Sequence, residues 1–145
     1  MNPEEHLYIL ALKQCKNIGN INLKKLIKNI GSAKKVWKST PQSLLAISGI
    51  GKNSIQNIGN QEFLNFAEKE LKFCEKHDIK IIHQDEESYP KHLLNCDDAP
   101  MILFYKGNLN NELNPVSIVG TRKLTAYGKH FIQDLTQELS GSKVC

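Results

Sequence analysis

The chain has 145 residues, enough for one domain or two small ones, and its hydrophobic content of 40% suits a soluble protein with a modest core. A formal net charge of +4 is compatible with nucleic-acid contact without being diagnostic of it. Glu4 and Glu5 stand where a secretory signal would carry cations, and no apolar run approaches the roughly 20 residues of a membrane helix. The four cysteines form no CxxC pair, which excludes a zinc ribbon and favours reduced thiols in a cytoplasmic protein.

Residues 3–78 are predicted to be helical. Apolar residues recur at helical spacing in a first helix that stops before Asn17 and in a second that ends at Gly31. Ser32 is expected to cap a short helix, and Pro41 to open another. A longer helix follows, whose predicted apolar face consists of Phe63, Phe66, Ala67, Leu71 and Cys74.

A weak internal repeat runs through this part. The segments NIGNINLKKLIKNIG (17–31) and GIGKNSIQNIG (49–59) both contain Ile-Gly, followed by an aliphatic residue four positions after the glycine. Gly19 therefore matches Gly51, and each Ile-Gly lies between two short predicted helices. This pattern predicts a helical helix-hairpin-helix (SAM-like) domain over residues 1–78.

The second copy of the repeat has the composition of a phosphate contact. Gly49 and Gly51 permit tight turning, so that amide groups at a helix start can point outward, and Lys52 adds a positive charge. Hairpins of this kind contact the duplex backbone without distinguishing bases. The alternative is that both glycines serve only to let two helices pack closely.

The pattern changes after residue 78. Short β-branched or aromatic runs predict strands over 79–84, 101–107 and 115–120, and a last helix is predicted over roughly 125–140. The third run is apolar enough for a strand buried on both faces, as in a parallel sheet. The sequence therefore predicts an α/β protein whose second domain occupies residues 79–145.

The segment VSIVGTRKLTAYGKHF (116–131) reads as a strand, a turn and a helix. Gly120 permits close backbone approach at the carboxyl end of the strand, where open α/β sheets bind ligands. Arg122 offers a planar fork to phosphate oxygens, and Thr125 is a candidate helix cap. The GxGxxG dinucleotide pattern is absent. The segment is either a phosphate site or an ordinary strand-to-helix turn with a surface arginine.

No catalytic or metal-binding pattern accompanies these segments. The five histidines show no HExxH or other metal spacing, and no serine or cysteine lies in a nucleophile elbow. His83, beside Asp85 and Glu86, is expected in a solvated loop. We therefore expect no catalytic residue, no metal and no cofactor.

Taken together, these segments resemble the N-terminal part of the DNA-processing protein A family (DprA, also called Smf). The resemblance includes the SGIGKNSIQNI hairpin, YPKHLLNCDDAPMILFYKG and VSIVGTRKLTAYG. The matching positions of the last two motifs are Tyr89, Pro90, Leu93, Leu94, Asp98, Pro100, Leu103, Tyr105, Gly107, Gly120, Thr121, Arg122, Thr125, Tyr127 and Gly128. These two motifs, in this order and at this spacing, are specific; the hairpin alone is not.

The resemblance implies a Rossmann-like domain that binds single-stranded DNA and is not an enzyme. Proteins of this family protect incoming strands in natural transformation and load the RecA recombinase onto them. By this analogy Arg122 would hold a DNA phosphate, Gly120 and Thr121 would offer donors, and Lys123 would add charge. The family continues beyond the point that corresponds to Cys145, so we expect a truncated Rossmann-like domain, and we expect the self-dimerisation and RecA contacts outside this chain.

Two alternatives remain open at this stage. The first is a nucleotide-binding Rossmann enzyme of the phosphoribohydrolase type, which would need a further glycine-rich and acidic motif. The second is a helix-hairpin-helix module that binds duplex DNA non-specifically through Gly49, Gly51 and Lys52. In every case the expected location is the cytoplasm, without membrane contact.

Overall fold

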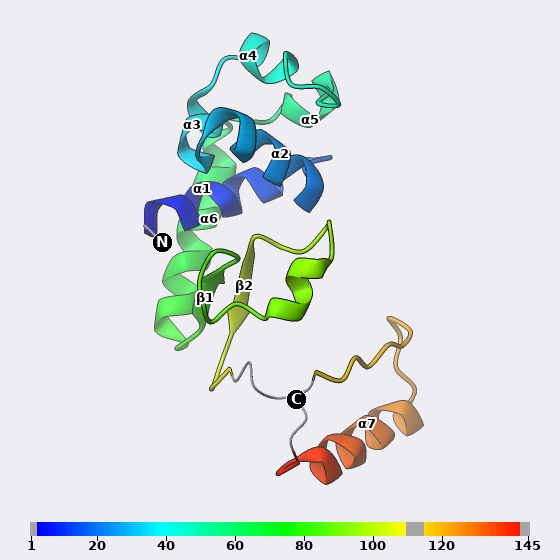
Figure 1. Cartoon of the computed structure of the whole chain (residues 1–145). Coiled ribbons are helices and arrows are strands. Elements are labelled where there is room, and N and C mark those ends of the chain that lie inside the picture. The colour runs from blue at the N-terminus through cyan, green and yellow to red at the C-terminus, as the bar shows by residue number, and fades with distance from the viewer. Residues whose placement is uncertain (1–2, 110–114, 143–145) are drawn as a thin grey trace. The chain divides into compact units, whose positions relative to one another are not determined.

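The computed structural model describes residues 3–109 and 115–142, and the chain divides into two units, Met1–Leu109 and Asn110–Cys145 (Figure 1). The described part of the first unit contains helices and a two-stranded sheet. Its elements, in chain order, are α1 (Pro3–Gln14), α2 (Asn20–Ile30), α3 (Ala33–Lys38), α4 (Pro41–Leu45), α5 (Lys52–Ile55), α6 (Gln61–Lys76), β1 (Lys80–His83), the 3-10 helix η1 (Lys91–Asn95) and β2 (Ile102–Tyr105). The described part of the second unit contains α7 (Ala126–Leu139).

Helix α1 is the centre of the first unit. Five consecutive residues, Tyr8 to Leu12, are buried, and consecutive residues of a helix point in different directions. A helical segment that is buried on every side must be covered on every side, and α1 packs against α2, α3 and α6. Figure 1 shows the long helix α6 running past α1 and on toward the sheet. The predicted apolar face of the first helix is therefore only part of its buried surface.

Local capping explains where the next helices begin and end. Gly31 ends α2 with φ 106°, a left-handed conformation that glycine adopts without strain. The Ser32 hydroxyl accepts a hydrogen bond from the Lys35 amide at the start of α3, and Thr40 caps α4 ahead of Pro41. These boundaries confirm the predictions from the sequence. In the part of the chain described here, no helix is long and apolar enough to cross a bilayer.

Strands β1 and β2 confirm two of the three predicted strands. They pair antiparallel, with Lys80 opposite Tyr105 and His83 opposite Ile102. The segment between them contains η1 and buries Tyr89, which is 1% exposed. The Tyr89 hydroxyl donates a hydrogen bond of 2.6 Å to the Pro100 carbonyl and so ties the two ends of this segment together.

The third predicted strand, over 115–120, is not formed, and that prediction is wrong. These residues have no regular secondary structure, and their side chains are exposed, Val119 by 93%. A strand is stabilised by hydrogen bonds to a neighbouring strand, and among the described residues none pairs with this segment. The described residues therefore contain helices and an antiparallel two-stranded sheet, and no parallel sheet. Residues 110–114 and 143–145, which belong to the domain predicted over 79–145, lie outside the described residues.

Candidate functional site

The loop before α7 carries Gly120, Thr121, Arg122 and Lys123, the four residues predicted to bind phosphate. All four are exposed, and they are consecutive, so the structure presents them on one short stretch of backbone. The Thr121 hydroxyl donates a hydrogen bond of 2.7 Å to the Lys123 carbonyl. In this conformation the hydroxyl proton of Thr121 is therefore engaged within the loop.

The start of α7 supplies free donors next to this loop. Thr125 caps the helix, and its hydroxyl accepts a hydrogen bond of 3.1 Å from the Gly128 amide. The amides of Ala126 and Tyr127, in the first turn, have no acceptor within the helix. The predicted role of Thr125 as a cap is confirmed, and the first turn combines exposed amides with the positive end of the helix dipole.

Arg122 is the only arginine in the sequence; the other cations are lysines. Its guanidinium can donate two parallel hydrogen bonds to a phosphate, whereas a lysine acts as a point charge. The loop thus combines a planar cation, a second cation and outward amides. This combination can bind phosphate oxygens.

The two predicted hairpins of the first unit share one backbone geometry. Each contains a residue with positive φ (Asn17, 67°; Gly49, 78°), followed by a buried isoleucine and then by a glycine that begins the second helix. Neither Gly19 nor Gly51 supplies a side-chain cap. The sequence repeat therefore corresponds to a repeated turn.

Polar side chains around the first hairpin are engaged within the molecule. The Asn20 side-chain amide donates to the Asp98 carbonyl at 2.8 Å, and the Lys24 ammonium donates to the Asp97 carbonyl at 3.1 Å. The Lys25 ammonium donates to the Ser48 carbonyl at 3.1 Å and thereby links the two hairpins. The start of α2 is thus occupied by the Asp97–Asp98 loop, a contact that the sequence analysis did not anticipate.

The second hairpin is open by comparison. Gly49, Gly51 and Lys52 are all exposed, and nothing lies within 4 Å of the position that a Cβ atom on Gly51 would take. A Cβ atom on Gly49 would lie only 2.9 Å from the Lys25 ammonium. Gly49 is therefore favoured mainly by its left-handed backbone, with φ 78°, whereas Gly51 has neither a positive φ nor a neighbour at that position. The sequence analysis assigned Gly49 and Gly51 the same role, but their backbone conformations and surroundings differ in the structure.

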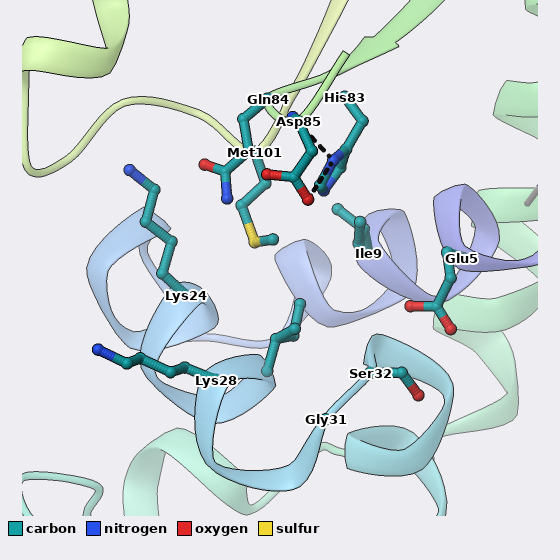
Figure 2. A pocket seen from close by; sticks show the side chains of 11 residues that line it. Glu5, Ile9, Lys24, Lys28, Gly31, Ser32, His83, Gln84, Asp85 and Met101 are labelled. Carbon is teal, nitrogen blue, oxygen red and sulfur yellow. Dashed lines mark hydrogen bonds and ion pairs between the residues drawn. The ribbon is translucent and has the colours of Figure 1, made fainter. Parts of the chain in front are cut away.

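A cavity of about 560 Å³ lies in the first unit, between α1, α2 and the sheet (Figure 2). Ile9, Ile27 and Met101 give it apolar walls. The Glu5 carboxylate at its edge is engaged, because its two oxygens accept hydrogen bonds from the Ala33 and Lys34 amides at 2.8 and 3.4 Å. In Figure 2 the ammonium groups of Lys24 and Lys28 extend away from Ile9. The cavity therefore has chiefly apolar walls, and it lies beside the start of α3, whose amides the Glu5 carboxylate binds.

His83, expected in a solvated loop, is 1% exposed at the end of β1, and that expectation is wrong. Its Nδ1 accepts a hydrogen bond of 3.2 Å from the Asp85 amide. Burial lowers the pKa of His83, the Asp85 carboxylate opposes this shift, and the nearby His6 adds to it. Burial likewise lowers the pKa of His6. Each imidazole has a buried Nε2 without a hydrogen-bond partner among the described residues.

Metal-binding geometry is absent from the described ranges, 3–109 and 115–142, where no three His, Cys, Asp or Glu side chains converge.

The exposure of Phe66 differs from the prediction. The sequence placed it on the buried face of its helix, but it is 41% exposed, and Phe73, one heptad later, is 52% exposed. The seven-residue spacing of the two phenylalanines, about two helical turns, was the sequence feature that could have indicated a separate exposed row.

Comparison with known proteins agrees with the motifs. The sequence model of the family described as DNA recombination-mediator protein A matches residues 80–145. Protein Smf of Synechocystis sp. is 30% identical over 148 residues, an alignment that covers 96% of this chain and 36% of that protein. DNA processing protein DprA of Bacillus subtilis is 38% identical over 63 residues, covering 42% of this chain and 21% of that protein. The matched region thus spans little more than a third of the Synechocystis protein and about a fifth of the Bacillus protein.

Proposed function

Because the chain belongs to the DprA/Smf family, we propose that it contributes single-stranded DNA binding to a protein that processes DNA in recombination. The observation that carries this proposal is the exposed loop Gly120–Lys123, which places the only arginine beside the free amides of α7. Phosphate contacts of this kind bind a DNA backbone irrespective of sequence. The role is one of binding, without catalysis.

We also propose the domain division expected from the sequence. Residues 1–78 form a helix-hairpin-helix domain, and residues 79–145 belong to a Rossmann-like DNA-binding domain. Two observations support this division: the family match begins at residue 80, and the repeated turn geometry lies wholly within the helical part. For the longer protein we propose a cytoplasmic role in natural transformation, with RecA as a partner and with self-dimerisation.

The test is oligonucleotide binding by Arg122 variants. Fluorescence anisotropy with a labelled oligo-dT at fixed, low ionic strength should show about tenfold or greater weakening for Arg122→Ala, since charge-assisted hydrogen bonds contribute roughly 1.5–3 kcal/mol. Arg122→Lys keeps the charge but loses the fork, so it should restore only part of the affinity. Lys38→Ala, an exposed lysine on α3, is the control for loss of one charge. Wild-type affinity in Arg122→Ala would refute the assignment.

The second hairpin favours one further candidate, non-specific binding of duplex DNA. Its supporting observation is that Gly51 and Lys52 are exposed while the first hairpin is occupied by the Asp97–Asp98 loop. If this hairpin contacts duplex DNA, Lys52→Glu should abolish duplex binding and leave binding of oligo-dT intact. Unchanged duplex binding in Lys52→Glu would reduce the hairpin to a packing element.

A further inference from the structure

Helix α6 presents two different faces. Its inner face carries Ala67 and Cys74, which are buried, together with Phe63 and Leu71, which pack against the core. At 100° per residue, Phe66 lies about 100° away from Ala67 around the helix. The exposed rings of Phe66 and Phe73 are therefore not part of the core.

The outer face has an aromatic row along the helix axis. Phe66 and Phe73 are 41% and 52% exposed, and they lie seven residues apart, a rise of about 10.5 Å at 1.5 Å per residue. The Phe73 ring is in contact with the His77 ring, at a centroid distance of 4.2 Å and an interplanar angle of 38°. The row thus ends in a pair of rings that hold each other in place at the end of the helix.

A row of cations runs beside the aromatic row. Lys69, Lys72 and Lys76 are exposed, at positions three and four residues apart, which places them along one edge of the helix. Lys69 lies about 60° around the helix from Phe66, next to the rings. Glu70 lies on the other side of the aromatic row, whereas Glu62, seven residues before Lys69, lies at the start of the helix in line with the lysines. Glu68 and Glu75 lie beyond the lysines, on the side away from the rings. An anionic polymer on this face would therefore contact the segment from Lys69 to Lys76, between the rings and these glutamates.

We propose that this outer face of α6, consisting of Phe66, Phe73, His77, Lys69, Lys72 and Lys76, is a second contact for single-stranded DNA. The proposal rests on the proposed function. Aromatic rings stack on bases irrespective of sequence, while a neighbouring row of cations follows the phosphates. Charge complementarity favours a nucleic acid over an apolar protein surface, and unpaired bases are needed because duplex bases are already stacked. This face lies in the first unit, and the Arg122 loop lies in the second.

The experiment compares three variants of the full chain by anisotropy over a range of salt concentrations. Phe66→Ala/Phe73→Ala should weaken oligo-dT binding roughly tenfold or more for each ring that stacks, with little change in the slope of log Kd against log salt. Lys69→Gln/Lys76→Gln should also weaken binding, and should reduce the slope by about 1.4, or 0.7 for each phosphate contact on a single strand. Ile21→Ala, which truncates a 54% exposed side chain on α2, is the matched control and should change neither quantity.

An abasic oligonucleotide of the same length separates stacking from charge. The wild-type chain should prefer oligo-dT over the abasic strand, and Phe66→Ala/Phe73→Ala should lose that preference. Equal affinity of the wild type for both strands, absence of oligo-dT binding, or a phenylalanine variant that instead dissociates a dimer in sedimentation would each overturn the proposal. Loss of binding in Arg122→Ala with an unaffected phenylalanine variant would leave the proposed function standing and refute only this second contact.

Discussion

Gly49→Ala should destabilise the helical unit chiefly through the backbone. Gly49 has φ 78°, in the left-handed region, where an alanine costs about 1–2 kcal/mol. Its new Cβ atom would also lie 2.9 Å from the Lys25 ammonium, which donates a hydrogen bond of 3.1 Å to the Ser48 carbonyl. Because a lysine end group is flexible, this contact adds at most the value of one exposed hydrogen bond, about 0.5–1 kcal/mol. The expected loss in the free energy of unfolding is about 1–3 kcal/mol.

Gly51→Ala is the matched control in the same hairpin. Its φ is −100°, and nothing lies within 4 Å of a Cβ atom there. Alanine is a poorer cap than glycine, but it also lowers the entropy of the unfolded chain, so we expect a change within about 0.5 kcal/mol. Urea unfolding followed by fluorescence of the only tryptophan, Trp37, which is 9% exposed, reports on this unit.

The result that would refute this reasoning is an equal effect of the two substitutions, or a loss below about 0.5 kcal/mol for Gly49→Ala. Repeating Gly49→Ala in a Lys25→Met background isolates the steric contact. The backbone part of the cost should persist there, since it depends on φ and not on the neighbouring ammonium. A double variant as stable as Lys25→Met alone would show that the positive φ carries no cost.

Two further predictions concern buried polar groups. The pKa values of His6 and His83 are lowered below 6.5, so the unfolded chain binds protons first as the pH falls through that value. The free energy of unfolding should therefore fall with decreasing pH below about 6.5, by up to about 1.4 kcal/mol per pH unit for each histidine, until the folded-state pKa is reached. His83→Gln should flatten this dependence in urea titrations between about pH 5.5 and 7.5, and an unchanged pH dependence would contradict the assignment. Tyr89→Phe should cost about 1–2 kcal/mol in urea unfolding, because it leaves a carbonyl that accepted a 2.6 Å hydrogen bond without that partner; unchanged stability would show that the bond contributes nothing.

Local chemistry made several boundaries predictable. A glycine at the end of α2, a serine before α3 and a threonine before α7 each act through hydrogen bonds or dihedral angles of neighbouring residues, so their effect is contained in a short segment. These parts of the fold and of the candidate site were available from the sequence.

Long-range contacts were not available in the same way. The apolar run over 115–120 indicates side chains that favour burial, but not which strand would pair with it, and none does so here. His83 follows two isoleucines and precedes acidic residues, so only the packing of β1 against the rest of the unit decides that it is buried. The loop that covers the first hairpin contacts Asn20 from 78 positions away. No local pattern contains that information.

The most direct test of the central claim is the salt dependence of single-stranded DNA binding by the wild-type chain and by Arg122→Ala. If Arg122 holds a phosphate, its removal releases about one fewer counterion, and the slope of log Kd against log salt should decrease by about 0.7. Arg122→Lys should retain the wild-type slope at lower affinity. Identical slopes and affinities for the wild type and Arg122→Ala would contradict the account.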